Sequence, residues 1–94
     1  MMYLISYDIQ ETKIRTKVAK LLEKAGMERI QYSVFLGDLT MTKKQKLTYM
    51  ISVLIAQDSV IFIPLHNDVL SEIEEIGEKL DWEYLKGVKK IMII

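Results

Sequence analysis

The segment Tyr3–Ile9, with the sequence YLISYDI, decides the fold of this chain. Its aromatic and β-branched residues predict a strand. Side chains alternate between the two faces of a strand, and both faces here are largely apolar, with Tyr3, Ile5, Tyr7 and Ile9 on one of them. An apolar character on both sides indicates a central strand, which ends close to Asp8.

Two helices are predicted between three extended segments. Apolar residues recur at helical spacing after Thr12, a candidate N-cap, as far as Gly26, which takes the usual position after a helix C-terminus: Ile14, Val18, Leu21, Leu22 and Ala25. A second helix is predicted after its candidate cap Thr42, with an apolar face formed by Leu47, Met50, Ile51, Leu54 and Ile55.

The order of these elements predicts an α+β fold, a ferredoxin-like β-α-β-β-α-β sandwich. This fold requires a hairpin inside the extended segment Arg29–Leu36, and we place its turn near Gln31–Ser33. The segment Ser59–Leu65 predicts a strand at a sheet edge, because Pro64 has no N–H to donate to a neighbour. We expect a single domain over residues 1–94, with its core in about residues 1–66.

The chain beyond this core suggests a second copy of the protein. Asn67–Leu80 is acidic and predicts only a weak helix, whereas Lys89–Ile94 (KKIMII) predicts a short apolar strand within residues 88–94. An exposed apolar strand of this kind promotes aggregation. We therefore expect an extra C-terminal strand that pairs with a partner protomer in a symmetric homodimer.

Composition limits the chemistry. The chain has 94 residues, no cysteine and one histidine, His66. Cysteine-ligated zinc, thiol nucleophiles and multi-histidine metal sites are therefore excluded within one chain. Bond cleavage would depend on carboxylates and a bound divalent metal. No apolar stretch is long enough to span a membrane, and no signal peptide is evident, so we expect a cytoplasmic protein.

Charge is distributed unevenly along the chain although the net charge is zero. Residues 1–46 carry nine Lys/Arg and five Asp/Glu, whereas residues 47–94 carry four and eight. This asymmetry is typical of a surface for nucleic acid or another anionic partner, although chance could also produce it with so few charges.

Asp8 is the first candidate site residue. A carboxylate at the end of a central strand can bind Mg²⁺ or Mn²⁺, and a twofold dimer could supply a second copy of it. The alternative is a structural cap on the following turn. Arg15, Lys17 and Arg29 belong to a basic set that could bind phosphates or form an ordinary solvated surface, and Phe35 could stack on a base or belong to the core.

The YDI end of the first strand and the block GMERIQYSVF resemble the small CRISPR-associated adaptation protein family, also described as CRISPR-associated endoribonucleases. The resemblance extends in detail from residue 2 to about residue 66. It implies a dimeric nuclease with Asp8 as catalytic and metal-linked residue, and Mg²⁺ or Mn²⁺ between protomers. It also implies nucleic-acid contacts at Arg15, Lys17, Arg29 and Phe35. Some members have arginine in place of Lys17, and lysine lacks the bidentate fork.

Three hypotheses remain at this stage. The first is a metal-dependent endonuclease acting on RNA or DNA. The second is a non-catalytic scaffold that holds duplex DNA and bridges dimers of the CRISPR integrase in spacer acquisition for antiviral defence. The third is a small-molecule-binding regulatory domain, a common use of this fold. The segment Ile9–Thr12 lacks the glycines that such a ligand loop usually needs, which argues against the third.

Overall fold

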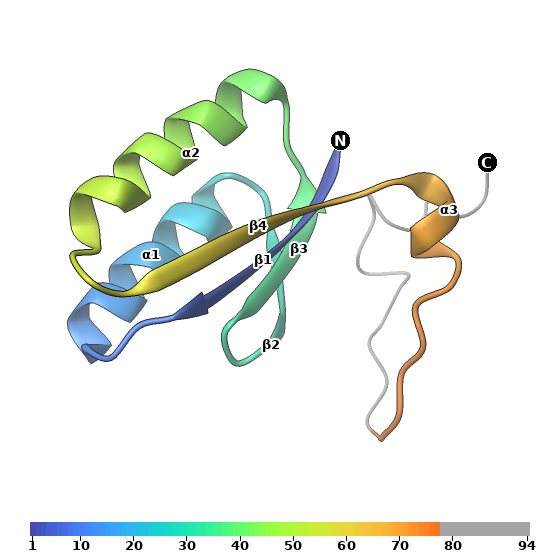
Figure 1. Cartoon of the computed structure of the whole chain (residues 1–94), viewed down its shortest axis with the longest axis horizontal. Coiled ribbons are helices and arrows are strands. Elements are labelled where there is room, and N and C mark those ends of the chain that lie inside the picture. The colour runs from blue at the N-terminus through green and yellow to red at the C-terminus, as the bar shows by residue number, and fades with distance from the viewer. Residues whose placement is uncertain (78–94) are drawn as a thin grey trace.

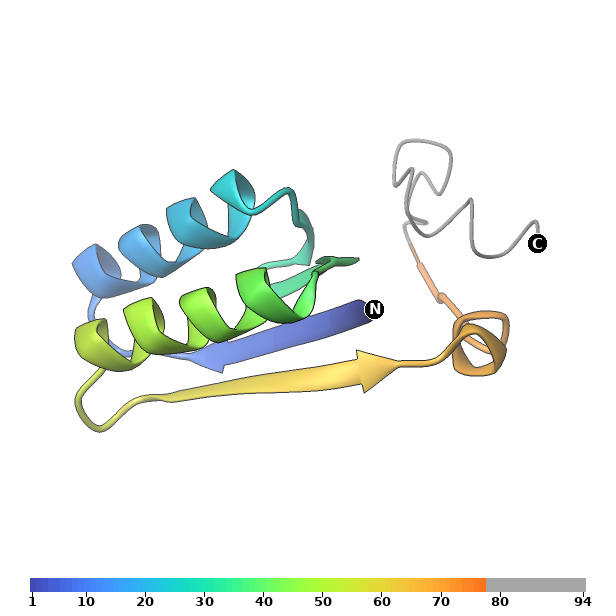
Figure 2. The same ribbon diagram turned by 90° about the horizontal axis from the view of Figure 1, so that it is seen from above.

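The computed structural model describes residues 1–77 and forms a two-layer sandwich with two helices on one face of a four-stranded sheet (Figures 1 and 2). The elements are β1 (Met2–Asp8), α1 (Thr12–Lys24), β2 (Glu28–Gln31), β3 (Val34–Asp38), α2 (Met41–Leu54), β4 (Ser59–Leu65) and the short α3 (Asn67–Leu70). The strand order is β2-β3-β1-β4, and every neighbouring pair is antiparallel. The predicted β-α-β-β-α-β sandwich is confirmed.

β1 is the central strand, as its two apolar faces predict. It pairs with β3 from Met2 to Ser6 and with β4 from Met2 to Asp8. β4 is an edge strand, which leaves Pro64 on a strand with only one neighbour. The predicted break in the β2–β3 segment is also confirmed, because β2 ends at Gln31 and β3 begins at Val34.

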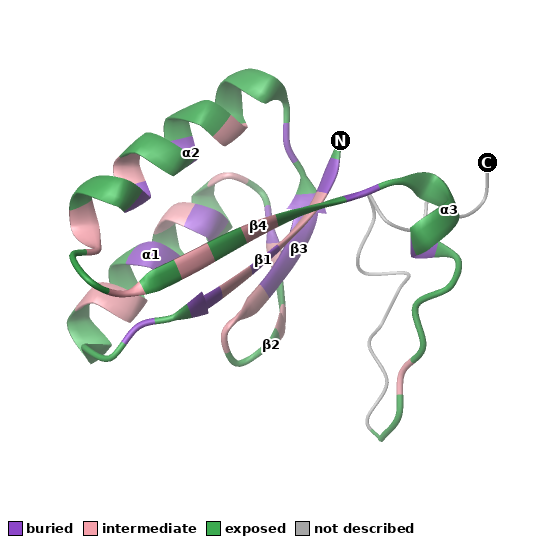
Figure 3. Cartoon of the chain, viewed as in Figure 1, coloured by how far each residue is buried: buried purple, intermediate pink, exposed green. Residues whose placement is uncertain are grey.

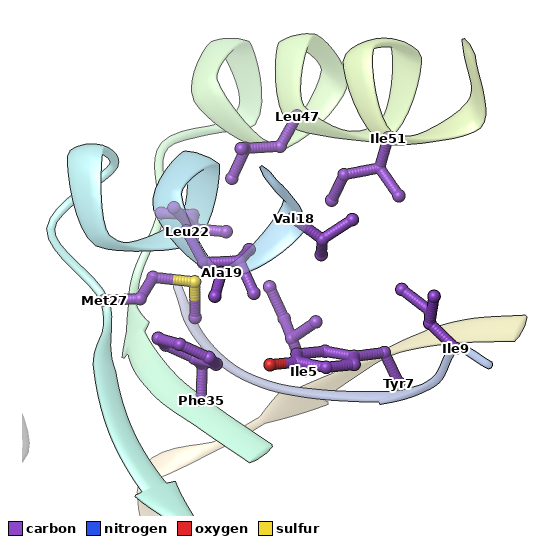
Figure 4. Packing of buried hydrophobic residues seen from close by; sticks show 11 residues of the cluster. Ile5, Tyr7, Ile9, Val18, Ala19, Leu22, Met27, Phe35, Leu47 and Ile51 are labelled. Atoms are coloured by element: carbon purple, nitrogen blue, oxygen red, sulfur yellow. The ribbon is translucent and has the colours of Figure 1, made fainter. Parts of the chain in front are cut away.

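The core lies between the sheet and the two helices (Figure 4). Its buried residues are Ile5, Tyr7, Ile9, Val18, Ala19, Leu22, Met27, Phe35, Leu39, Leu47 and Ile51. The odd-numbered residues of β1 point into this layer, because alternation directs them all to the face that the helices cover. Burial of these side chains is the main contribution to the stability of the fold.

The opposite face of the sheet is less covered (Figure 3). Leu70 of α3 is buried against Met2, Leu36 and Leu65 at one end of this face. From Ser59 to Ile63, β4 alternates between exposed and half-buried residues (Figure 3). Ile61 and Ile63 on this strand are exposed by 53% and 41%. Since Ile61 pairs with Ser6 and Ile63 with Leu4, the residues on this face include Leu4, Ser6 and Asp8, which follow the same alternation. We call it the open face.

The helix ends differ from the sequence predictions at their caps. Thr12 is the first residue of α1 rather than its cap, and its hydroxyl accepts from Arg15 instead. Thr40, not Thr42, caps α2, because its side chain accepts from the N–H of Lys43 at 3.1 Å. Gly26 takes the predicted position after α1, with a φ of 91° that favours glycine.

The weak helix predicted over Asn67–Leu80 is too long. In the described residues the helix ends at Leu70. The following acidic stretch buries no apolar face, and Ile76 is 97% exposed. Without such a face a short helix lacks the tertiary packing that stabilises it. The predicted tail strand, residues 88–94, lies outside the described residues. No helix within residues 1–77 is long and apolar enough to cross a membrane.

Candidate functional site

Asp8 lies where β1 ends, on the open face of the sheet, and its side chain is exposed. Its backbone pairs with Ser59 at the start of β4. Among residues 1–77, no donor hydrogen-bonds to its carboxylate, so the structure shows no capping role for this side chain in that part of the chain. The carboxylate is therefore available to an external ligand.

Arg15 organises the loop that follows Asp8. From the second turn of α1 its Nη1 donates to the carbonyl oxygens of Ile9 and Gln10, both at 2.9 Å, and its Nη2 donates to Thr12 Oγ1 at 2.7 Å. The loop is also held by Asp58, the residue before β4, whose Oδ1 accepts from the N–H of Gln10 at 3.3 Å. Much of the donor capacity of Arg15 is thus used inside the protein, which indicates a positioning role.

Arg29 is exposed on the β2–β3 hairpin and is held in two ways. Its Nη1 donates to the carbonyl oxygen of Tyr32 at 2.6 Å, and its guanidinium lies 5.0 Å from the centre of the Phe35 ring. Phe35 is in turn stacked against Tyr7, with 6.2 Å between ring centres (Figure 4). A cation fixed on an aromatic ring keeps its other N–H groups in a defined orientation.

The expectation that Phe35 stacks on a base needs correction. Its side chain is fully buried in the core, so in this structure it has no free face for a base. The alternation of side chains along β3 directs Phe35 to the face that the helices cover, where Tyr7 and Met27 also pack. The ring contributes to the site indirectly, because Arg29 lies over it.

Phe35→Leu is expected to lower the free energy of unfolding by about 1–2 kcal/mol, because a buried ring is replaced by a smaller side chain and the contact with Tyr7 is lost. Urea denaturation checks this. If Phe35 were instead an exposed residue that stacks on a base, its substitution would change the free energy of unfolding by less than about 0.5 kcal/mol. Such a result would contradict the assignment of Phe35 to the core. The exposed Tyr49→Leu on α2 serves as the control.

Lys17 does not line the groove that contains Arg15 and Arg29. It is exposed and lines a shallow hollow of about 270 Å³ between α1 and α2, together with Lys20, Lys24, Leu21 and Leu54. The structure therefore brings Arg15 and Arg29 to one groove beside the hairpin and leaves Lys17 on another side of α1.

Tyr32 was missed as a site residue, and Lys20 was predicted only as a member of the basic set that could bind phosphates. Lys20 and Tyr32 line the groove beside Arg15 and Arg29. Lys20 belongs to the lysine series of the first helix, where spacing alone does not distinguish one lysine from another. Tyr32 could have been noticed as an aromatic residue placed in a predicted turn, where burial is uncommon.

The small two-layer sandwich is the fold that the resemblance to CRISPR-associated adaptation proteins implies. A model of the family "CRISPR associated protein Cas2" matches residues 1–73. The chain belongs to the Cas2 family. A CRISPR-associated endoribonuclease Cas2 of Archaeoglobus fulgidus is 37% identical over 67 residues, which cover 69% of this chain and 71% of that protein.

Other relatives agree over more of the chain. One from Synechocystis sp., also named CRISPR-associated endoribonuclease Cas2, is 37% identical over 79 residues, covering 82% of this chain and 85% of its own. The crystal structure of Streptococcus pyogenes Cas2 superposes with a TM-score of 0.74 at 27% identity, covering 82% of this chain and all of that one. A chain of a partial Cas6-RT-Cas1–Cas2 complex superposes with a TM-score of 0.69 at 32% identity, and the match covers 80% of this chain and 83% of that one.

Proposed function

We propose that this protein is a metal-dependent endonuclease of CRISPR spacer acquisition, of the endoribonuclease type that its relatives' names state, and that it acts as a symmetric homodimer. The observation that carries the proposal is the position of Asp8, an exposed carboxylate on the same face of the sheet as uncovered apolar side chains. A twofold dimer through this face would place both copies of Asp8 at one interface.

The open face supports such a dimer. Ile61 and Ile63 are exposed on β4, and Leu4 and Val34 beside them are only half-buried. Neighbouring aliphatic side chains on one sheet face gain stability when they are removed from water. An isologous contact uses the same patch on both protomers, so one apolar face is sufficient.

Mg²⁺ or Mn²⁺ is the expected cofactor. Within residues 1–77 no cluster of three or more His, Asp or Glu side chains could hold a metal ion. Mg²⁺ is usually held by one or two carboxylates together with waters and substrate phosphates. Two copies of Asp8 fit that requirement, whereas one chain alone supplies a single carboxylate. When bound, the ion would supply an activated water and stabilise the charge on the phosphodiester.

The other residues of the chain have supporting tasks. Arg15 fixes the loop after Asp8 through its three hydrogen bonds. Arg29, held on Phe35, would use its remaining N–H groups to bind a phosphate. Together they would orient a nucleic-acid strand beside the carboxylate, and correct positioning of the reactants provides a large part of a catalytic rate increase.

A cleavage assay tests the proposal. Purified protein is incubated with end-labelled single-stranded RNA, single-stranded DNA and duplex DNA, in Mg²⁺, Mn²⁺ or chelator. We expect cleavage that requires the metal, and the strand that is cut names the substrate. Cleavage that persists in chelator, or no cleavage of any strand, would contradict the proposal.

A non-catalytic scaffold is the second candidate, and it is compatible with the first. One structural relative is a chain of a partial Cas6-RT-Cas1–Cas2 complex, which supports the CRISPR integrase as a partner. A second observation is the excess of lysine on the helix layer. A further hollow of about 360 Å³ there is lined by Lys24, Lys43 and Lys46 over apolar residues, with no carboxylate in its lining. Such a surface suits the phosphates of duplex DNA.

Lys17→Ala is expected to weaken duplex DNA binding and to reduce the slope of log K against log salt by about 0.9, the value for one phosphate contact. Fluorescence anisotropy over a salt series measures the slope. Lys17→Arg keeps the charge and should leave the slope unchanged. An unchanged slope in Lys17→Ala would remove this residue from the DNA-binding surface.

A further inference from the structure

A groove of about 300 Å³ lies between α1 and the β2–β3 hairpin. The groove and Asp8 lie at the same end of the sheet, because Tyr7 donates its N–H to the carbonyl oxygen of Ser33 in the hairpin turn at 3.0 Å. The side chains that matter for binding come from three elements: Tyr7, Thr12, Arg15, Lys20, Arg29 and Tyr32. None of the functions proposed above requires the whole groove.

The charges of the groove favour an anion. Three cationic side chains, Arg15, Lys20 and Arg29, line it against one carboxylate, Glu23. Arg15 is largely occupied by its own loop. Among the described residues Arg29 donates one hydrogen bond, to the carbonyl oxygen of Tyr32, and a guanidinium has five N–H groups. Lys20 and Arg29 are therefore the groups that can bind a phosphate.

The exposed aromatic ring of the groove belongs to Tyr32. It is 72% exposed, although it sits in a two-residue turn held by the hydrogen bond from Arg29 to its carbonyl oxygen. An exposed ring beside a fixed guanidinium provides a flat surface and a positive charge together. These are the two components with which proteins bind unpaired bases and their phosphates.

We propose that this groove binds one unpaired nucleotide of a single-stranded nucleic acid, with the base stacked on Tyr32 and the adjoining phosphate held by Lys20 and Arg29. A paired base in a duplex has both faces covered by its neighbours and offers none to Tyr32. The inference rests on the proposed function in one respect, since it makes single strands the substrate class of the Asp8 site. Binding itself requires no metal.

Fluorescence anisotropy of the full chain, in chelator, tests this with four probes: a short single-stranded RNA, the matching single-stranded DNA, a duplex, and an abasic phosphodiester chain of equal length. Tyr32→Ala is expected to weaken binding of the base-bearing single strands about 10- to 100-fold. The abasic chain and the duplex should bind as they do to the unmodified protein. A loss restricted to RNA would also support the proposal and would identify the sugar preference.

Two variants separate stacking from other effects. Tyr32→Phe keeps the ring and should bind within about twofold of the unmodified protein. Tyr49→Ala removes a ring of equal exposure, 71%, from α2 outside the groove, and should also leave affinity unchanged. Lys20→Ala, in contrast, should weaken the abasic and base-bearing single strands by the same factor, because it removes a phosphate contact.

The proposal is overturned if Tyr32→Ala binds single strands as the unmodified protein does, or if it loses the same factor with the abasic chain. Since these measurements are made without metal, a failure of cleavage at Asp8 does not affect them. Conversely, metal-dependent cleavage with an unaffected Tyr32→Ala variant would retain the proposed function and reject this groove.

Discussion

Asp8→Asn is expected to lower metal-dependent cleavage about a thousandfold. A bound divalent ion contributes several kcal/mol to transition-state stabilisation, and about 4 kcal/mol corresponds to a factor of a thousand. Asparagine preserves the shape of the side chain but removes the negative charge that would hold the ion. The side chain is exposed on the open face, so the fold should remain intact. Initial rates at saturating Mn²⁺, with a melting curve for each variant, measure the effect.

Asp58→Asn is the matched control for this variant. Asp58 lies at the same end of the sheet, where its Oδ1 accepts from the backbone N–H of Gln10 at 3.3 Å. Asparagine keeps that acceptor, so the loop stays in place and cleavage should change by less than about threefold. Equal losses in both variants would show that negative charge near the loop matters, rather than Asp8 as a ligand.

Ile61→Glu is expected to convert the proposed homodimer to a monomer and to lower its association constant about a thousandfold or more. Twofold symmetry places two new carboxylates in one apolar interface, and each buried unpaired charge costs several kcal/mol. Ile61 is 53% exposed in the single chain, so the monomer itself should remain folded. Light scattering coupled to size-exclusion chromatography gives the mass directly.

Val53→Glu provides the comparison. Val53 is 68% exposed on α2, on the helix side of the sandwich and away from the open face. The same charge introduced there should leave the mass unchanged. A dimer that survives Ile61→Glu would place the interface elsewhere and would remove the reason for expecting two copies of Asp8 at one site.

The sheet was predictable because its strands carry their own signals. The bounds of β4 agree with the prediction, and those of β1 differ by one residue at each end. The alternation of apolar and polar residues and the enrichment in β-branched residues are local features of the sequence, so they predict strands without knowledge of the tertiary contacts. The helix caps were less predictable. Thr12 and Thr42 are residues of the preferred type, but the start of each helix depends on where the preceding strand leaves the sheet.

The candidate site was only partly predictable, because a role depends on which side of an element a residue faces. Arg15 and Lys17 are two positions apart, yet one turns to the Asp8 loop and the other to the gap between the helices. Phe35 is buried, whereas Tyr32, three residues earlier, is exposed. Residue type alone does not tell which member of each pair contributes to the site. Whether an aromatic side chain in a hairpin is buried or exposed depends on which face of the sheet it occupies, and that depends on the strand register.

The most direct test of the central claim is a calorimetric titration of the protein with Mn²⁺, combined with its mass in solution. The claim is that two copies of Asp8 share one ion across the open face. It predicts one ion per dimer, and loss of that binding in both Asp8→Asn and Ile61→Glu. One ion per chain, or binding that persists in Asp8→Asn, would contradict it.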